Sequence, residues 1–214
     1  MNFYIVDAGP DVKKKIECFG GTIIAHIDEV TEPEETVAVV QNNISFSYRL
    51  AMARSREMVC VTPDFIHHSC YFKRVMTKHW YVPTFYQFEG LRCEVHFAGR
   101  PFEFRNILVL SDSVNAFLRI RYLLKQAGAY VYFGIKYVKW FEEHNNLGLE
   151  FDFTVCLNEV SKETIKVLKQ MDATPVYEQF ILDSIILGEV VDCFEPRFYY
   201  MPEIYSELTD DEEN

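Results

Sequence analysis

Two acidic residues follow short apolar segments and could contribute to a magnesium site. Asp7 follows residues 3–6, and Asp112 follows residues 107–110. Carboxylates placed after neighbouring strands hold Mg²⁺ in phosphotransfer enzymes of the receiver type, which also need a lysine at a later strand end. The segments ending near 62 and 177 carry no such lysine, and no glycine-rich nucleotide motif or serine-hydrolase motif occurs. A receiver-like enzyme is therefore only a remote alternative, and we expect no catalytic activity.

His67, His68 and Cys70 form a cluster of metal-ligand residue types. Adjacent helical positions point about 100° apart, and no second ligand pair follows, so we expect no metal and no other cofactor. The chain has 6 cysteines without a C-x-x-C pair, mostly among apolar neighbours. This pattern predicts free, mostly buried thiols.

Composition favours a globular protein with a substantial core. Of 214 residues, 49% are hydrophobic and 25% are charged, enough for one large domain or two small ones. No apolar run approaches the roughly 20 residues of a membrane helix, and the first residues lack the pattern of a signal peptide. We expect a soluble intracellular protein that does not contact membranes.

The net charge of −11 argues against a protein that coats nucleic acid, and no direct nucleic-acid binding is expected. Much of the acidic excess is local. It lies in residues 28–35 and in the tail 203–213, which both read as solvated, mobile segments.

Two halves of the chain repeat one pattern. The run Val61-x-x-x-Phe65-Ile66-x-x-Ser69 recurs as Val176-x-x-x-Phe180-Ile181-x-x-Ser184, and residues 37–42 correspond to 153–158. Each half begins with an apolar strand, at 3–6 and 107–110, and continues through a helix that ends at Gly20-Gly21 or Ala127-Gly128. Further helices are expected near 45–55 and 161–171. Each half is therefore predicted to run strand, helix, strand, strand, helix, strand, helix, which indicates an α/β fold with a small parallel sheet covered on both faces.

The helices predicted over 113–127 and 180–187 are apolar around most of their circumference. Such helices need two burial partners, which we expect to be their own sheet and the other half of the chain. The two halves are therefore predicted to pack into one rigid module.

These features resemble the tandem BRCT repeat. The resemblance covers nearly the whole chain and rests on the paired glycine-ended helices and on Phe65 and Phe180, which replace the usual tryptophan of the family. It implies two repeats, each a four-stranded parallel sheet flanked by helices. The predicted boundaries are repeat 1 at 1–76, a packed inter-repeat linker at 77–105, repeat 2 at 106–200 and an acidic disordered tail at 201–214. Stretches at 48–53, 79–83 and 100–112 are similar to the C-terminal pair of the Tudor-plus-BRCT checkpoint mediators of DNA double-strand breaks.

Tandem BRCT modules bind phosphorylated serine peptides between their repeats, and the resemblance implies the same site here. It places the basic side chain at Arg49, the backbone N–H donor at Gly9, and the usual hydroxyl position at Ala8, or at Asp7 with a one-residue shift. Alanine there would lose one charge-assisted hydrogen bond, about 1.5–3 kcal/mol. Asp7 itself is read as a cap of the helix that follows Pro10.

The apolar peptide pocket of the family falls on Ala51, Leu123 and Leu182, which equally suit a core between repeats. The resemblance thus implies a nuclear, non-enzymatic module of the DNA damage response. Its partners would be a phosphorylated protein or histone tail and other damage-response proteins. The alternative is a phosphate-independent adaptor that binds folded partners through repeat 1 and the linker.

Overall fold

The computed structural model describes residues 1–41, 47–88, 91–95, 100–134 and 150–200. It divides into two compact units, Met1–Gly99 with Leu182–Glu189, and Arg100–Ile181 with Val190–Asn214. No helix in the described ranges is long and apolar enough to span a membrane. Residues 135–149 and the predicted tail, 201–214, lie outside these ranges.

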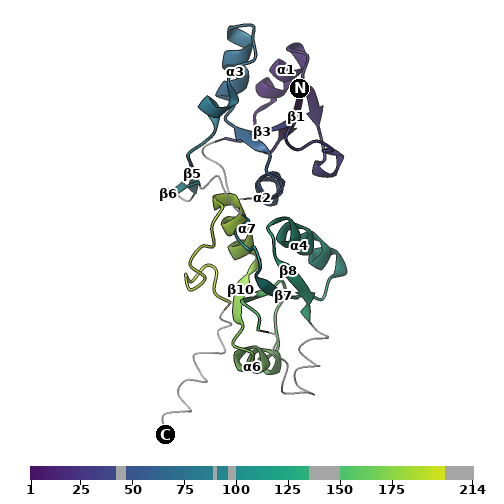
Figure 1. The fold of residues 1–214 in the computed structure, drawn as a ribbon, viewed down its shortest axis with the longest axis vertical. Helices are drawn as coiled ribbons and strands as arrows, with labels where there is room; N and C mark the ends of the chain where they lie inside the picture. Colours follow the sequence, from purple (N-terminus) through teal and green to yellow (C-terminus); the bar gives the residue numbers. More distant parts are fainter. Residues whose placement is uncertain (42–46, 89–90, 96–99, 135–149, 201–214) are drawn as a thin grey trace. The chain divides into compact units, whose positions relative to one another are not determined.

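The first unit is built on a parallel sheet of order β2-β1-β3-β4. The strands are β1 (Asn2–Ile5), β2 (Thr22–Ile24), β3 (Thr36–Val39) and β4 (Val59–Val61), and the helices are α1 (Pro10–Cys18), α2 (Tyr48–Ser55) and α3 (Asp64–Tyr71), with a short 3-10 turn η1 (Ile27–Glu29). Alternate sheet residues such as Phe3 and Val37 pack with Ile16 of α1 and Phe65 of α3 in one core. Figure 1 shows α1 and α3 on one face of this sheet and α2 on the other.

The local sequence explains where these helices begin and end. Pro10 stands in the first turn of α1, where its missing N–H costs nothing, and Gly20 adopts a φ of 78° beyond its end. Ser47 caps α2, because its hydroxyl accepts the N–H of Leu50 at 3.3 Å. Serine side chains also cap two helices of the second unit, at Ser113 and at Ser161.

The residues between the two sheets form a 3-10 turn and a hairpin. The turn η2 (Lys78–Tyr81) is joined to the end of β4 by a hydrogen bond from Thr62 N–H to Tyr81 O. The hairpin pairs β5 (Phe85–Phe88) with β6 (Leu91–Glu94), antiparallel. Tyr86 is fully buried in it and interacts with the Cys60 thiol of β4, so this segment is packed against the first unit.

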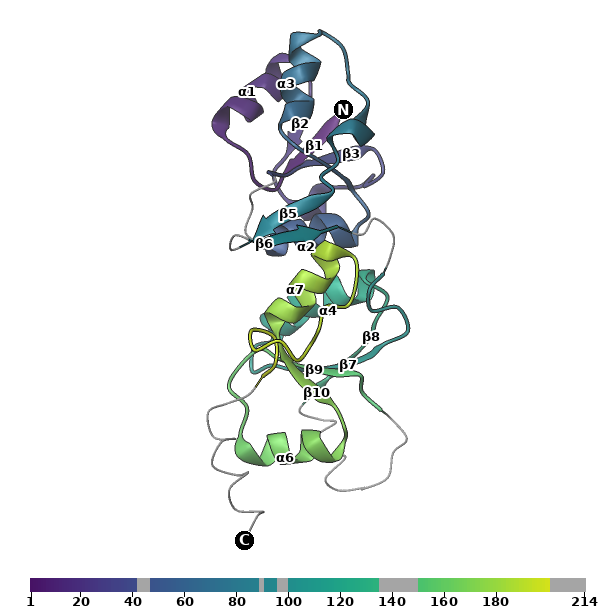
Figure 2. The same cartoon turned by 90° about the vertical axis from the view of Figure 1, so that its left-hand side faces the viewer.

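The second unit repeats the topology of the first, with a parallel sheet of order β10-β9-β7-β8. Its elements are β7 (Asn106–Leu110), α4 (Val114–Gln126), β8 (Tyr130–Phe133), β9 (Phe153–Cys156), α6 (Lys162–Gln170), β10 (Thr174–Tyr177) and the first part of α7 (Glu178–Leu187), whose residues from Leu182 onwards belong to the first unit. Phe180 packs against Phe153 and Phe198, with ring centroids 4.8 and 6.0 Å apart. Figure 2 shows α6 on the face of the sheet opposite to α4.

The α/β fold with two four-stranded parallel sheets is confirmed, and each predicted strand and helix occurs within a few residues of its expected place. One detail differs. Ile120, Leu123 and Leu124 of α4 are buried, whereas Val114 and Leu118 are exposed, so α4 is not buried on all sides as its composition suggested. Among the cysteines, all free, Cys18 is exposed while Cys60 and Cys156 are buried.

Candidate functional site

The loop after β1 lies at the end of the first sheet that is formed by the carboxyl ends of its strands. Its backbone is tied to β3, because the N–H groups of Val6 and Asp7 both donate to Val39 O, at 3.1 and 3.4 Å. Gly9 then begins α1. A Cβ built on Gly9 would meet no other atom within 4 Å, so the backbone there is open to a ligand. This opening lies at the amino end of α1, where backbone N–H groups favour an anion.

Ala8 and Asp7 differ in their surroundings. The Ala8 methyl is half-buried and packs against the core formed by α1 and α3. The Asp7 side chain is exposed. The prediction that Asp7 caps α1 is wrong, because the capping position is occupied by Gly9, which has no side chain to accept a hydrogen bond.

Arg49 is fixed at the start of α2 by a tyrosine of β1. Its Nε donates to Tyr4 Oη at 3.1 Å, and its Cζ lies 5.1 Å from the centre of the Tyr4 ring. Tyr4 is itself only 2% exposed, so this support is rigid. The two terminal nitrogens of Arg49 form no hydrogen bond within the ranges that the structure describes, and the side chain is exposed.

The topology brings Gly9 and Arg49 to the same end of one sheet. β1 and β3 are parallel neighbours, with Ile5 opposite Val39, so the loop after β1 and the start of α2 after β3 leave the sheet at one end. The site therefore offers an open backbone segment and an anchored guanidinium. Tyr4 escaped the sequence analysis, since it reads as one more apolar residue of a strand. Its position between Phe3 and Ile5, on the other face from the α1–α3 core, was the available signal.

The three residues proposed for the apolar peptide pocket are all buried. Ala51 and Leu123 have no exposed surface, and Leu182 retains 8%. Ala51 and Leu182 belong to the first unit and Leu123 to the second. The peptide pocket that they would form stays a prediction.

The residues considered for metals have other partners. His67 Nδ1 lies 2.8 Å from Lys15 Nζ, His68 Nδ1 lies 3.0 Å from Tyr81 Oη, and the Cys70 thiol donates to Lys15 O. No group of three or more potential ligands gathers in the part of the chain that the structure describes. These contacts hold α3 against α1 and the linker.

Comparisons with known proteins identify the fold of the chain. No family model and no curated protein sequence matches the chain. Among solved structures it is similar to the BRCT5–BRCT6 domains of S. pombe Brc1, at 10% identity and a TM-score of 0.52, over 95% of this chain and 98% of that one. It is also similar to residues 820–1070 of Rtt107p, at 14% identity and a TM-score of 0.50, over 95% and 92% of the two chains.

The chain has the tandem BRCT fold. The strand order found in both sheets and the near-complete coverage of the Brc1 pair agree on this point. Each unit contains one of the two four-stranded parallel sheets. Phe65 and Phe180 are 1% and 0% exposed, so both are core residues. A complex of Rtt107p with a phosphorylated histone matches less closely, at 13% identity, a TM-score of 0.47, and 95% and 93% coverage.

Proposed function

We propose that this BRCT pair is a non-enzymatic interaction module of the DNA damage response that binds a phosphoserine peptide. The observation that carries the proposal is the exposed guanidinium of Arg49, which is anchored on Tyr4 at the same end of the sheet as the open backbone of Gly9. Its partners would be a phosphorylated protein or histone tail and other damage-response proteins, in the nucleus. The sequence stretches shared with the Tudor-plus-BRCT checkpoint mediators point to the same role.

The phosphate would be held by two kinds of donor. The Nη atoms of Arg49 form a planar fork that matches two phosphate oxygens, while its Nε remains on Tyr4. The Gly9 N–H would hold a third oxygen, assisted by the amino end of α1. Ala8 contributes no hydroxyl, so we expect weaker binding than at a site with serine there.

Peptide binding tests the proposal directly. Calorimetry would compare a histone tail peptide, phosphorylated on serine, with its unphosphorylated form; the histone of the known Rtt107p complex supplies this probe. We expect the phosphorylated peptide to bind about tenfold better or more. Arg49→Ala should remove this difference, since loss of a charge-assisted contact costs about 1.5–3 kcal/mol.

Arg74→Ala is the matched control, because Arg74 is also exposed but follows α3, away from the loop after β1. It should leave the preference for the phosphorylated peptide unchanged. Equal affinity for both peptides in the parent chain would refute phosphate recognition.

The phosphate-independent adaptor remains the second candidate, and the exposed aromatic residues of the linker region favour it. Trp80 is 67% exposed and Phe104 is 73% exposed, both within the interval 77–105. Large exposed aromatic side chains are enriched where proteins bind one another. If Trp80→Ala abolishes capture of a damage-response partner that Arg49→Ala does not affect, the adaptor function is supported.

A further inference from the structure

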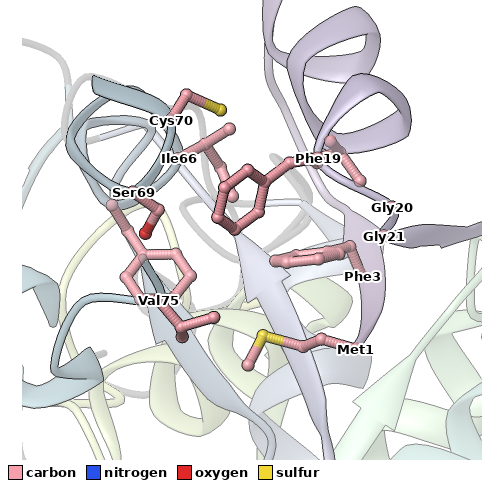
Figure 3. Close-up of a pocket in the computed structure, with 11 residues that line it drawn as sticks. Met1, Phe3, Phe19, Gly20, Gly21, Ile66, Ser69, Cys70 and Val75 are labelled. Atoms are coloured by element: carbon pink, nitrogen blue, oxygen red, sulfur yellow. The ribbon is translucent and has the colours of Figure 1, made fainter. Parts of the chain in front are cut away.

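A cavity of about 120 Å³ opens at the far end of the first sheet from the phosphate site. Met1 precedes β1 and Gly21 precedes β2, whereas Gly9 follows β1, so the cavity and the phosphate site lie at opposite ends of the same strands. It is lined almost entirely by apolar side chains of β1, α1 and α3: Met1, Phe3, Ile16, Phe19, Phe65, Ile66 and Val75, with Gly20, Gly21, Ser69 and Cys70. In Figure 3 Phe3 and Phe19 project towards Ile66 from the opposite wall.

The cavity suits one large apolar side chain. An apolar cavity of roughly 150 Å³ accommodates benzene, so the volume here is on the scale of an aromatic ring or a leucine side chain. The polar groups in its wall are already engaged, because Ser69 Oγ accepts the Met76 N–H at 3.2 Å and the Cys70 thiol donates to Lys15 O. The rim is open to solvent: Met1, Phe19 and Val75 are 46%, 41% and 53% exposed.

The rim is basic although the chain as a whole is acidic. Lys73 and Arg74 form the turn between Cys70 and Val75, and their N–H groups donate to Cys70 O and Ser69 O of the cavity wall. Both side chains are exposed and lack an ion-pair partner among the residues placed by the structure. Glu17 is the exposed acidic residue next to Ile16 in the sequence, so Lys73 and Arg74 outnumber it. Because the chain carries a net charge of −11, this basic rim is a local exception.

We infer that this cavity is a second docking site, which binds an acidic segment of a partner protein through one aromatic or branched apolar side chain. The anchor would fill the cavity between Phe3, Phe19 and Ile66, and acidic residues next to it would face Lys73 and Arg74. Charge complementarity favours such a partner over a second copy of this chain, since two molecules of net charge −11 repel each other. The site needs no phosphate and is independent of Arg49.

A designed peptide tests this inference. A fluorescent nonapeptide with one central phenylalanine between runs of four glutamates and aspartates would be titrated with the whole chain and followed by anisotropy. Replacing the phenylalanine with alanine should weaken binding about tenfold or more, as expected for loss of a buried ring. Backbone NMR shifts on binding should concentrate at Ile16, Ile66 and Val75, and affinity should fall as salt is added.

Variants with matched controls locate the site. Val75→Glu, on the exposed rim, should weaken binding about tenfold, whereas Val114→Glu on α4 should not, although Val114 is 63% exposed. The pair Lys73→Glu and Arg74→Glu should act like Val75→Glu, whereas Lys162→Glu with Lys166→Glu on α6 should have little effect. All these side chains are exposed, so the fold is not at risk.

Three results would overturn the inference. The first is equal affinity for the phenylalanine and alanine peptides, and the second is a set of NMR shifts that excludes the cavity residues. The third is a change in the NMR shifts of the cavity residues when residues 201–214 are deleted from the free chain, which would identify the chain's own tail as the occupant. Val75→Glu should leave binding of the phosphorylated histone peptide unchanged. The experiment can therefore refute the cavity proposal without refuting the proposed phosphate site.

Discussion

At the scale of single residues, Tyr4 of β1 holds the side chain of Arg49 on α2 in place. The tyrosine is buried, yet its hydroxyl reaches Arg49 Nε at 3.1 Å, 45 positions away in sequence. A free arginine side chain loses rotamer freedom when it binds an anion. Because Tyr4 already fixes Nε, less of that freedom remains to be lost at Arg49.

Tyr4→Phe should therefore weaken binding of the phosphorylated histone peptide a few-fold, less than Arg49→Ala does. The phenyl ring remains beneath the guanidinium, and only a hydrogen bond worth about 0.5–1.5 kcal/mol is lost. Calorimetry measures the affinity, and a melting temperature close to the parent value would show that the fold is intact. An affinity equal to that of the parent would mean that the Tyr4 hydroxyl does not position Arg49.

The buried thiols of Cys60 and Cys156 provide a second prediction at this scale. Burial raises the pKa of Cys60 to about 11 and that of Cys156 to about 12. At pH 8 iodoacetamide should therefore modify the exposed Cys18 quickly and these two thiols only on unfolding. Mass spectrometry of time points gives the order of labelling.

The same pKa shifts make stability depend on pH in the alkaline range. The unfolded thiols ionise near their ordinary pKa of 9.0, while the folded ones keep their protons, so the folded state binds more protons between about pH 9 and 11. Stability should decline as pH rises through this interval.

In the labelling experiment, rapid modification of Cys60 at pH 8 in the folded protein would contradict the assigned burial.

At the scale of elements, two glycines at opposite ends of the first sheet have different requirements: Gly9 follows β1 and Gly21 precedes β2. A Cβ on Gly21 would lie 2.7 Å from Phe3 Cε2 and 2.8 Å from Ile16 Cγ2, closer than carbon atoms approach. Gly9 has open space around it and a φ of −64°, which any residue adopts. Gly21 is thus needed for packing, while Gly9 is available for function.

Gly21→Ala should lower the free energy of unfolding by about 1–3 kcal/mol, because the core must move to admit the methyl group. Gly9→Ala is the matched change and should leave stability nearly unaltered, while it weakens phosphopeptide binding by crowding the open backbone. Urea unfolding of both variants separates the two effects. A stable Gly21→Ala protein would show that β2 can shift away from Phe3.

Most elements could be predicted from the sequence because their signals are local. The recurrence of Val61 to Ser69 at 176–184 gave the second unit from the first, and the glycine pairs marked the helix ends. The contacts of Arg49 with Tyr4 and of Tyr86 with Cys60 were not predictable, since they join residues distant in sequence. The cavity beside Phe19 also escaped, because an apolar residue that lines an opening has the same pattern as one that fills a core.

At the scale of the whole molecule, the first unit is discontinuous in sequence. It comprises Met1–Gly99 together with Leu182–Glu189, the later part of α7. Within this unit Arg54 Nε donates to Ile186 O at 3.2 Å. The first unit therefore depends on residues that follow the larger part of the second unit, Arg100–Ile181.

Residues 1–99 expressed alone should consequently be much less stable than the same unit within the full chain, and the full chain should unfold in a single transition. Differential scanning calorimetry tests both statements. Two separate transitions in the full chain, or a fragment of residues 1–99 that melts at the parental temperature, would be inconsistent with a shared α7.

The divided first unit also bears on synthesis. Its sheet leaves the ribosome first, but Leu182–Glu189 follow only after Arg100–Ile181 of the second unit, on the order of ten seconds later at about 5–20 residues per second. During that interval the helix α2, which carries Arg49, lacks part of its native packing. We expect the nascent chain to expose apolar surface that the later part of α7 covers in the complete protein, and a premature stop before residue 182 to release a protein that has Arg49 and Gly9 but an incomplete first unit.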